Sequence, residues 1–227
     1  NMLMKISVKT NIKDVTRGLS RLQKKQIPFA ASKTLNQLAF DLTKRKGKGV
    51  LGAATATTFD KKKGKGSTPF TQRNFFFENS NKKNLTAYVF WDSRNADYMK
   101  FQVHGGNRSP RSKAILVPTK HTKKRLNKFG NIGKGEVSKL LADKSKYFSG
   151  SPLGAKSKSE GIWERYGRST KRGGQKVRKV ISYAKKASYQ PRFKFAQITA
   201  DFVASEKGGF DTKFRKNLRK AIADKKR

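Results

Sequence analysis

The stretch that decides the fold is IPFAASKTLNQLAFDL, residues 27–42. Its apolar residues recur at steps of three and four, which is the spacing of one face of an α-helix. They are Ala31, Leu35, Leu38 and Leu42. Pro28 suits the first turn of a helix, where the missing N–H leaves no intrahelical hydrogen bond unmade. The stretch therefore predicts a helix that begins near Pro28 and buries its alanine–leucine face.

A second helix is predicted just before this one, so that the chain opens with a helix pair. Residues 4–10 alternate as a short strand does, and Asn11 can then cap a helix, with Asp14 three residues later. The apolar face of that helix is made of Ile12, Val15, Leu19 and Leu22. Gln26-Ile27-Pro28 breaks the periodicity, and we expect the hinge of the pair there.

The centre of the chain predicts a mostly antiparallel sheet. Residues 70–78 and 85–91 form a hairpin around the polar turn 79–84, and residues 161–166 pair with 177–183. A further strand at 115–117 and short helices at 96–103 and 136–142 are expected. Phe75-Phe76-Phe77 is interpreted as core, with a stacking platform for nucleic-acid bases as the alternative.

The chain ends in two helices, separated by Gly208-Gly209. The first has an apolar stripe of Phe195, Ile198 and Phe202, and the second has one of Phe210, Phe214, Leu218 and Ile222. Together these elements predict an α+β fold: an N-terminal helix pair, a central mostly antiparallel sheet, C-terminal helices and long basic loops. We expect one domain over residues 1–227.

The charge of the chain points to a partner outside it. Lysine and arginine number 55 against 14 acidic residues, a formal net charge of +41 on 227 residues. Such self-repulsion opposes compactness unless a polyanion or an acidic protein surface neutralises it. Duplex nucleic acid, with one charge per ~1.7 Å of axis, is one such polyanion. Cysteine is absent, and no apolar run approaches the ~20 residues of a membrane span, so we expect a soluble protein made in the cytoplasm.

Three segments are predicted to be mobile basic loops, near 44–68, 107–128 and 167–176. Lys-Gly-Lys-Gly occurs twice, at 46–49 and 63–66, and residues 107–128 contain eight basic residues and no acidic one. Either these loops are simply solvated or they contact nucleic acid or an acidic partner. The candidate contact residues are Lys44, Arg45, Lys46, Lys48, Lys61, Lys62, Lys63, Lys65, Arg108, Arg111, Lys113, Lys123, Lys124, Arg125, Arg168, Lys171 and Arg172.

Catalytic chemistry is not indicated, and we expect neither an enzyme nor a metal or cofactor site. The two histidines, His104 and His121, lie in basic surroundings without a second histidine at metal-binding spacing. The sequence has no nucleophile elbow, zinc-protease motif or phosphate-binding loop. Metal-dependent nucleases use two or three carboxylates plus a lysine, and Glu160 and Glu164 lie four residues apart on a predicted strand, where alternation places them on the same side. With 14 acidic residues scattered among 55 basic ones, we expect most carboxylates to be paired electrostatically, which argues against a nuclease.

Several segments together resemble the prophage minor tail protein Z family, the lambda-type tail completion proteins. They are IPFAASKTLN (27–36), YMKFQVHGGNR (98–108), FGNI (129–132), YFSG (147–150), GIWERYG (161–167) and SYQPRF (188–193). The resemblance rests on their order and spacing over roughly residues 10–225. The lysine load is heavier than we would expect for the family.

The resemblance implies a virion protein that finishes the head-proximal end of a long phage tail. It also implies a ring subunit, in a homohexamer that matches the tail's symmetry. The expected neighbours are the tail terminator, tail tube and head-completion proteins, and the end of the packaged DNA. Trp163 is interpreted as core or as an intersubunit contact, and the assembly interface would comprise Trp163, Arg215, Lys216, Arg219 and Lys220. The alternative function is non-specific nucleic-acid binding of the ribosomal or nucleoid type.

Overall fold

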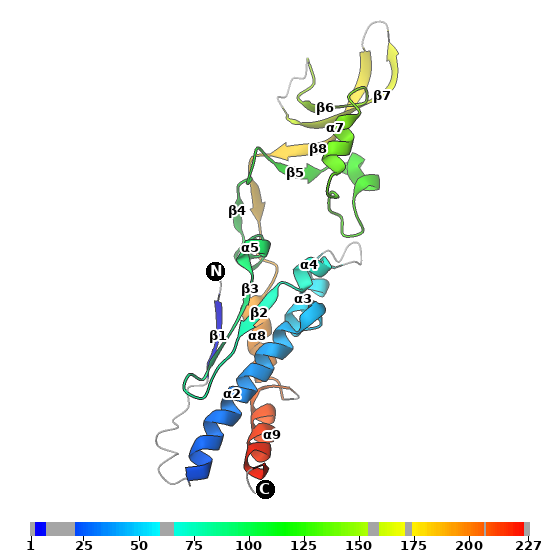
Figure 1. Ribbon diagram of the computed structural model, residues 1–227. Coiled ribbons are helices and arrows are strands. Elements are labelled where there is room, and N and C mark those ends of the chain that lie inside the picture. Colours follow the sequence, from blue (N-terminus) through cyan, green and yellow to red (C-terminus); the bar gives the residue numbers. More distant parts are fainter. Residues whose placement is uncertain are drawn as a thin grey trace. The chain divides into compact units, whose positions relative to one another are not determined.

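The computed structural model describes residues 3–7, 21–59, 66–153, 159–170, 174–206 and 208–224. The chain is an α+β protein with antiparallel sheets and C-terminal helices, as predicted (Figure 1). It divides into two compact units with separate hydrophobic cores, where the sequence suggested one domain. Unit 1 takes its described residues from 1–61, 66–104 and 191–227, and unit 2 from 105–190.

Unit 1 contains a three-stranded antiparallel sheet. Its strand order is β1 (Leu3–Ser7), β3 (Thr86–Trp91) and β2 (Phe75–Glu78). Val89 of β3 lies opposite Met4 on one side and Phe77 on the other. The predicted hairpin and its alternation are confirmed, because Ala87, Val89 and Trp91 are buried. The first arm is shorter than predicted, since Pro69–Gln72 form the short helix α4.

Helix α2 runs from Arg21 to Thr43, with Pro28 in its interior. The predicted hinge at residues 26–28 is therefore wrong, although the predicted alanine–leucine face is buried. Proline inside a helix costs about 3 kcal/mol. Gln26 and Ala30 flank the proline and are both buried, so packing on either side of it offsets this cost. The other predicted helix lies mainly in residues 11–20, outside the described residues.

The region predicted as a mobile loop over 44–68 contains a 3-10 turn, η2 (Arg45–Gly47), and a helix, α3 (Val50–Thr58). Leu51 and Thr55 are fully buried, and Leu51 belongs to the core of unit 1. The prediction failed because the flanking lysines dominate the composition of the region. The stretch VLGAATATT carries no charge and can be buried as a helix.

The glycines of the first Lys-Gly-Lys-Gly repeat allow the turn between α2 and α3 to pack closely against α4 and the end of α2. Gly47 has φ 72°, and a Cβ atom on it would lie 2.7 Å from the Cβ of Gln72. A Cβ atom on Gly49 would lie 2.5 Å from the carbonyl oxygen of Leu42. Side chains do not fit at either position, so these glycines are a packing requirement and not a source of flexibility.

The segment after β3 holds two short helices in place of the predicted helix 96–103. They are α5 (Ser93–Ala96) and α6 (Met99–His104). Asp92 caps α5 by accepting a hydrogen bond from the backbone N–H of Arg94 at 3.0 Å. Gly105, with φ 71°, follows α6 in the left-handed conformation that commonly ends helices.

The predicted C-terminal helices are confirmed as α8 (Phe195–Ala204) and α9 (Phe210–Ala223). Phe195 stacks on Phe75 and meets the edge of Trp91, at centroid distances of 6.2 and 5.3 Å. Phe75 is thus a core residue, while Phe76 beside it is exposed and stacks on Phe90. The core of unit 1 is therefore an aromatic cluster that joins the sheet to the C-terminal segment.

Helix α9 packs on α2 through polar residues that its apolar stripe did not predict. Asn217 is buried, and its side-chain amide donates to Thr34 Oγ1 at 3.0 Å and to Gln37 Oε1 at 2.8 Å. Lys213 forms an ion pair of 2.8 Å with Asp41 of α2. The predicted stripe member Ile222 is instead 38% exposed.

Unit 2 contains two antiparallel sheets. In the smaller one, β4 (Gly106–Arg108) pairs with β9 (Ala187–Tyr189). The larger has the order β5-β8-β7-β6, with bounds Ile115–Pro118, Gly174–Ala184, Gly161–Thr170 and Tyr147–Gly150. Helix α7 (Glu136–Ala142), which was predicted, contributes Leu140 to a core with Ile162 and Ile181.

The other two predicted loops are largely regular structure. The region 107–128 contains β5 and a 3-10 helix, η4 (Lys120–Arg125). The region 167–176 holds the ends of β7 and β8, which pair as far as Thr170 and Gly174. Basic residues alternate with small and polar ones there, and this composition alone predicted a loop. Pairing between the two strands continues into the segment instead.

The pairing of β7 with β8 shifts by one residue, and residues at the start of η4 hydrogen-bond to β8 at this shift. Ile162 lies opposite Ile181 but Trp163 lies opposite Lys179, so Val180 is an extra residue on β8. The carbonyl of Val180 accepts hydrogen bonds from the backbone N–H of Thr119 and from the Thr122 hydroxyl. The irregular strand is thus fixed by the segment that precedes it in the chain.

We predict that Asn217→Ala lowers the free energy of unfolding of the full-length protein by about 1–2 kcal/mol, because it removes the two hydrogen bonds that the buried Asn217 amide donates to Thr34 and Gln37 of α2. Urea unfolding followed by circular dichroism measures the change. Lys216→Ala, at an exposed neighbouring position of the same helix, is the control and should change stability by less than about 0.5 kcal/mol. Equal effects from the two substitutions would contradict the role of Asn217.

Candidate anion-binding surfaces

The predicted contact residues of unit 1 gather at the turn between α2 and α3. Lys44, Lys46 and Lys48 are all exposed there. Lys46 has φ 64°, so the close-packed glycine turn holds its backbone in a conformation that side-chain-bearing residues seldom adopt. The side chain of Arg45 is not among those described, and Lys61, Lys62, Lys63 and Lys65 lie outside the described residues.

The predicted contact residues of unit 2 do not form one cluster. Arg108 is half-buried on β4, whereas Arg111 and Lys113 are exposed in the loop before β5. Arg168 is exposed on β7. The side chains of Lys123 and Lys124 are not described, and Lys171 and Arg172 lie outside the described residues.

Arg125 has a structural role, contrary to its prediction as a contact for an external anion. Its guanidinium pairs with Glu136 of α7 at 3.2 Å and donates a hydrogen bond to the Tyr147 hydroxyl. It also lies over the Tyr147 ring, 5.2 Å from the centroid. These contacts tie η4 to α7 and β6, so this cation is already neutralised within unit 2.

Glu164 is the buried centre of the same network. Its side chain is 8% exposed, and its carboxylate accepts hydrogen bonds from Arg178 at 2.7 Å and from the Tyr147 hydroxyl at 3.2 Å. Lys146 lies 3.5 Å from the carboxylate. Burial by itself would raise the pKa of Glu164, but the hydrogen bonds from Arg178 and Tyr147 and the charges of Arg178 and Lys146 lower it overall.

Glu160 and Glu164, the two carboxylates considered for a nuclease, lie in different environments. Glu160 is exposed and Glu164 is buried among cations. Within the part of the chain that the structure describes, no group of three or more histidine, aspartate or glutamate residues could hold a metal ion. Glu164 contacts an arginine, a lysine and a tyrosine, and its ion pairs stabilise unit 2.

Trp163 lies on the opposite face of the sheet, half-buried. Its Nε1–H donates to the carbonyl of Gly150 at 2.9 Å, and Lys179 lies 4.8 Å from its ring centroid. Phe148, opposite Trp163 in register, carries Arg165 over its ring at 4.6 Å. The indole is therefore held in place and covered by a cation, which favours the structural interpretation over an open intersubunit contact.

The outer face of α9 is the densest basic surface of unit 1. Arg215, Lys216, Arg219 and Lys220 are all exposed. None of them pairs with a carboxylate among the described residues. Spacings of one, three and four residues place them on neighbouring parts of one helical surface, away from the face that packs on α2.

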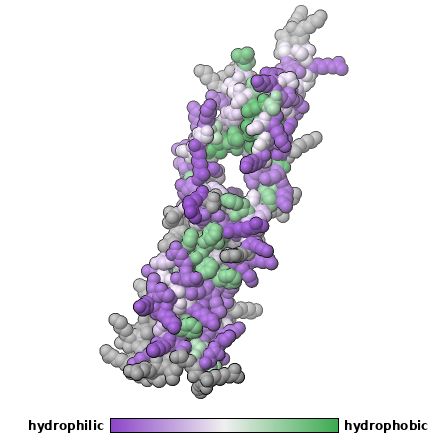
Figure 2. All heavy atoms as spheres, in the orientation of Figure 1, coloured by the Kyte–Doolittle hydropathy of each residue, from purple (hydrophilic) through white to green (hydrophobic). Residues whose placement is uncertain are grey.

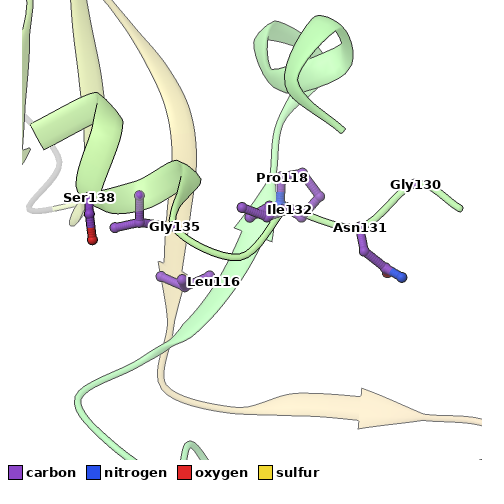
Figure 3. Close-up of a pocket in the computed structure, with 9 residues that line it drawn as sticks. Leu116, Pro118, Gly130, Asn131, Ile132, Gly135 and Ser138 are labelled. Carbon is purple, nitrogen blue, oxygen red and sulfur yellow. The ribbon is translucent and has the colours of Figure 1, made fainter. Parts of the chain in front are cut away.

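The coloured surface in Figure 2 is mostly hydrophilic, with hydrophobic residues in separate patches. A pocket of about 520 Å³ in unit 2 lies between β5 and the segment that leads into α7 (Figure 3). Leu116, Pro118 and Ile132 line it together with Asn131 and Ser138. No titratable side chain lines this pocket, so no general acid or base lies beside the Ser138 hydroxyl among its lining residues.

No protein-family model, curated protein or solved structure matches the chain significantly. Among the described residues, none of the helices is both long and apolar enough to cross a membrane.

The pairing of residues 161–166 with 177–183 is confirmed, and the outward extension of β7 and β8 to Thr170 and Gly174 is the feature that sequence reasoning missed. The signal was present: no acidic residue occurs between Glu164 and Asp201, while the same stretch contains eleven lysines and arginines. Strand alternation was recognised only as far as Tyr166, because Gly167 was interpreted as the start of a loop.

We predict that Glu164→Gln weakens unit 2. The substitution keeps the size of the side chain but removes the charge that balances Arg178 and Lys146, and it should lower the free energy of opening by about 2 kcal/mol. Hydrogen–deuterium exchange of β7 and β8 in the full-length protein measures this. Glu160→Gln is the matched control and should leave the exchange unchanged; an unaltered exchange rate in Glu164→Gln would refute the assignment.

The lowered pKa of Glu164 also predicts an acid dependence. A carboxyl group whose pKa is lower in the folded than in the unfolded protein stabilises fully above the unfolded value, about 4.3 for glutamate. That contribution is lost as the pH falls through the lower folded value. The stability difference between wild type and Glu164→Gln, measured by urea unfolding, should therefore be largest at pH 6 and shrink towards pH 2. A difference that stays constant over this interval would contradict it.

Proposed function

We propose that the protein is a non-enzymatic structural subunit of a phage virion, placed at the head-proximal end of the tail, where it helps to join head and tail. Its basic surfaces would contact DNA or acidic faces of neighbouring neck proteins. A homohexameric ring, with tail terminator, tail tube and head-completion proteins as neighbours, is part of this proposal.

The observation that carries the proposal is positive charge without an internal counter-charge. Some of the described carboxylates are paired with individual cations, as Asp41 is with Lys213 and Glu136 with Arg125. The basic face of α9 remains exposed, and so do Lys44, Lys46 and Lys48 in the turn before α3. Six copies in a ring would multiply this charge, so an assembly of this kind needs an anionic neighbour.

The order of the tail-completion-like segments supports the phage assignment. They extend over both units, from the α2 segment 27–36 to the segment 188–193 before α8. A pocket without titratable groups and a glutamate bound by cations give no support to an enzyme.

A free, non-specific nucleic-acid-binding protein is the second candidate. The exposed basic hairpin of β7 and β8 favours it, since phosphate contacts need cations and no base readout. The two candidates differ in location: a virion protein is retained in particles, whereas a free binder co-purifies with host nucleic acid.

We predict that purified particles of the parent phage contain the protein at a few copies each, consistent with six. Arg215→Gln/Arg219→Gln should reduce the yield of joined particles several-fold, because it removes charge from the α9 surface without touching its packing on α2. Quantitative mass spectrometry of particles and electron microscopy of head–tail joining measure the two effects.

The control for joining is Lys24→Gln/Lys25→Gln, which removes the same charge from exposed positions of α2. It should leave joining near normal. Absence of the protein from particles would contradict the proposed function, and equal losses with both double variants would contradict a specific role for α9.

A further inference from the structure

The larger sheet of unit 2 continues as a two-stranded ribbon beyond its neighbouring strands. β6 pairs with β7 only as far as Tyr147 opposite Glu164, and β5 pairs with β8 only as far as Pro118 opposite Ile181. β7 and β8 continue to pair with each other to Thr170 and Gly174. We call residues 166–170 and 174–177 the ribbon. In Figure 1 its strands run side by side past β6.

Apart from Tyr166 and Val177, the described side chains of the ribbon are polar or cationic and exposed. Arg168 and Lys176 are exposed, and neither pairs with a carboxylate among the described residues. Gln175 donates back to the carbonyl of Gly167 at 3.3 Å, across the two strands. Tyr166 is the one large aromatic residue of the described ribbon, 40% exposed.

The base of the ribbon is held firmly by the sheet. Arg178 pairs with the buried Glu164 and lies over the Tyr166 ring, 5.2 Å from its centroid. Arg165 donates to the carbonyl oxygens of Lys144 and Ser145 at 3.0 and 3.2 Å. Glu164, the last carboxylate before the ribbon, is thus already paired with Arg178 at the base of the ribbon. The charged residues of the ribbon itself are all positive.

We propose that the ribbon binds duplex DNA through the phosphate backbone, without sequence preference. A two-stranded ribbon fits the major groove, which is about 12 Å wide. Arg168 and Lys176, on opposite strands of the ribbon, would each neutralise a phosphate. Binding of duplex DNA by the ribbon does not depend on the proposed function. The inference rests on that function only in identifying the duplex as the end of the packaged phage genome.

Other partners fit the ribbon less well. Proteins that bind single strands stack bases on several aromatic side chains, but Tyr166 stands alone here and already contacts Arg178. A protein–protein interface needs a desolvated apolar centre, and the exposed described residues of the ribbon are tyrosine, glycine, serine, glutamine and basic side chains. Phosphates on a regular duplex match what the ribbon presents.

The test is the salt dependence of binding to a 30-base-pair duplex of arbitrary sequence, using the full-length protein between 50 and 300 mM NaCl. Each phosphate contact contributes about 0.9 to the slope of log K against log salt. Arg168→Gln/Lys176→Gln should therefore reduce the slope by about 1.8 and weaken binding on the order of 50-fold at 0.1 M salt. Circular dichroism and the urea midpoint check that the variant is folded.

The matched control is Lys185→Gln/Lys186→Gln, which removes the same charge from exposed residues of unit 2 outside the ribbon. It should change the slope by much less. Equal reductions by both variants, or an unchanged slope in the ribbon variant, would overturn the proposal. So would a larger loss on a 30-nucleotide single strand, or a loss confined to binding of polyglutamate. These results are independent of whether particles contain the protein, so the two proposals can fail separately.

Discussion

Positive charge that the chain cannot neutralise by itself is the constraint on which the rest of the structure depends. Fourteen carboxylates stand against 55 lysines and arginines. In both units the hydrophobic cluster contains no charged residue, and some carboxylates pair with individual lysines or arginines, as Asp41 does with Lys213 and Glu164 with Arg178. Glu164 shows this most clearly, because it draws Arg178 and Lys146 together with a tyrosine at the centre of one sheet.

The two cores are built differently under this constraint. Unit 1 depends on aromatic rings, with Phe75, Trp91 and Phe195 in mutual contact, and adds buried amide and hydroxyl hydrogen bonds between α2 and α9. Unit 2 has a smaller aliphatic core beneath α7 and supplements it with ion pairs and cation–π contacts. The cations that pair with Glu164 and Glu136 are therefore part of the stability of unit 2, while those on the ribbon and on α9 remain available to partners.

Much of the fold could be predicted from the sequence, because periodicity identifies buried faces directly. The buried face of α2, the alternation of β3 and the positions of α7, α8 and α9 follow from apolar spacing alone. The helix break predicted at Pro28 was wrong, because packing of the residues on both sides of the proline outweighs its low helix propensity. The helix α3 and the outer parts of β7 and β8 were missed because lysines and glycines dominate their surroundings, and composition does not reveal backbone pairing or close glycine contacts.

The functional surfaces were less predictable than the fold. Arg125 could not be distinguished by sequence from the other basic residues around it, since its partners Glu136 and Tyr147 come from different elements. Exposure of Lys44, Lys46 and Lys48 was anticipated, whereas the immobilised glycine turn that carries them was not.

The central claim is that the cations of this protein require an external counter-charge, and the most direct measurement is the stability of the isolated full-length chain as a function of added anion. Self-repulsion is relieved by screening. The account predicts that the urea midpoint rises between 20 and 500 mM NaCl and rises further when a short DNA duplex is added at low salt. A midpoint that is independent of both salt and duplex would contradict it.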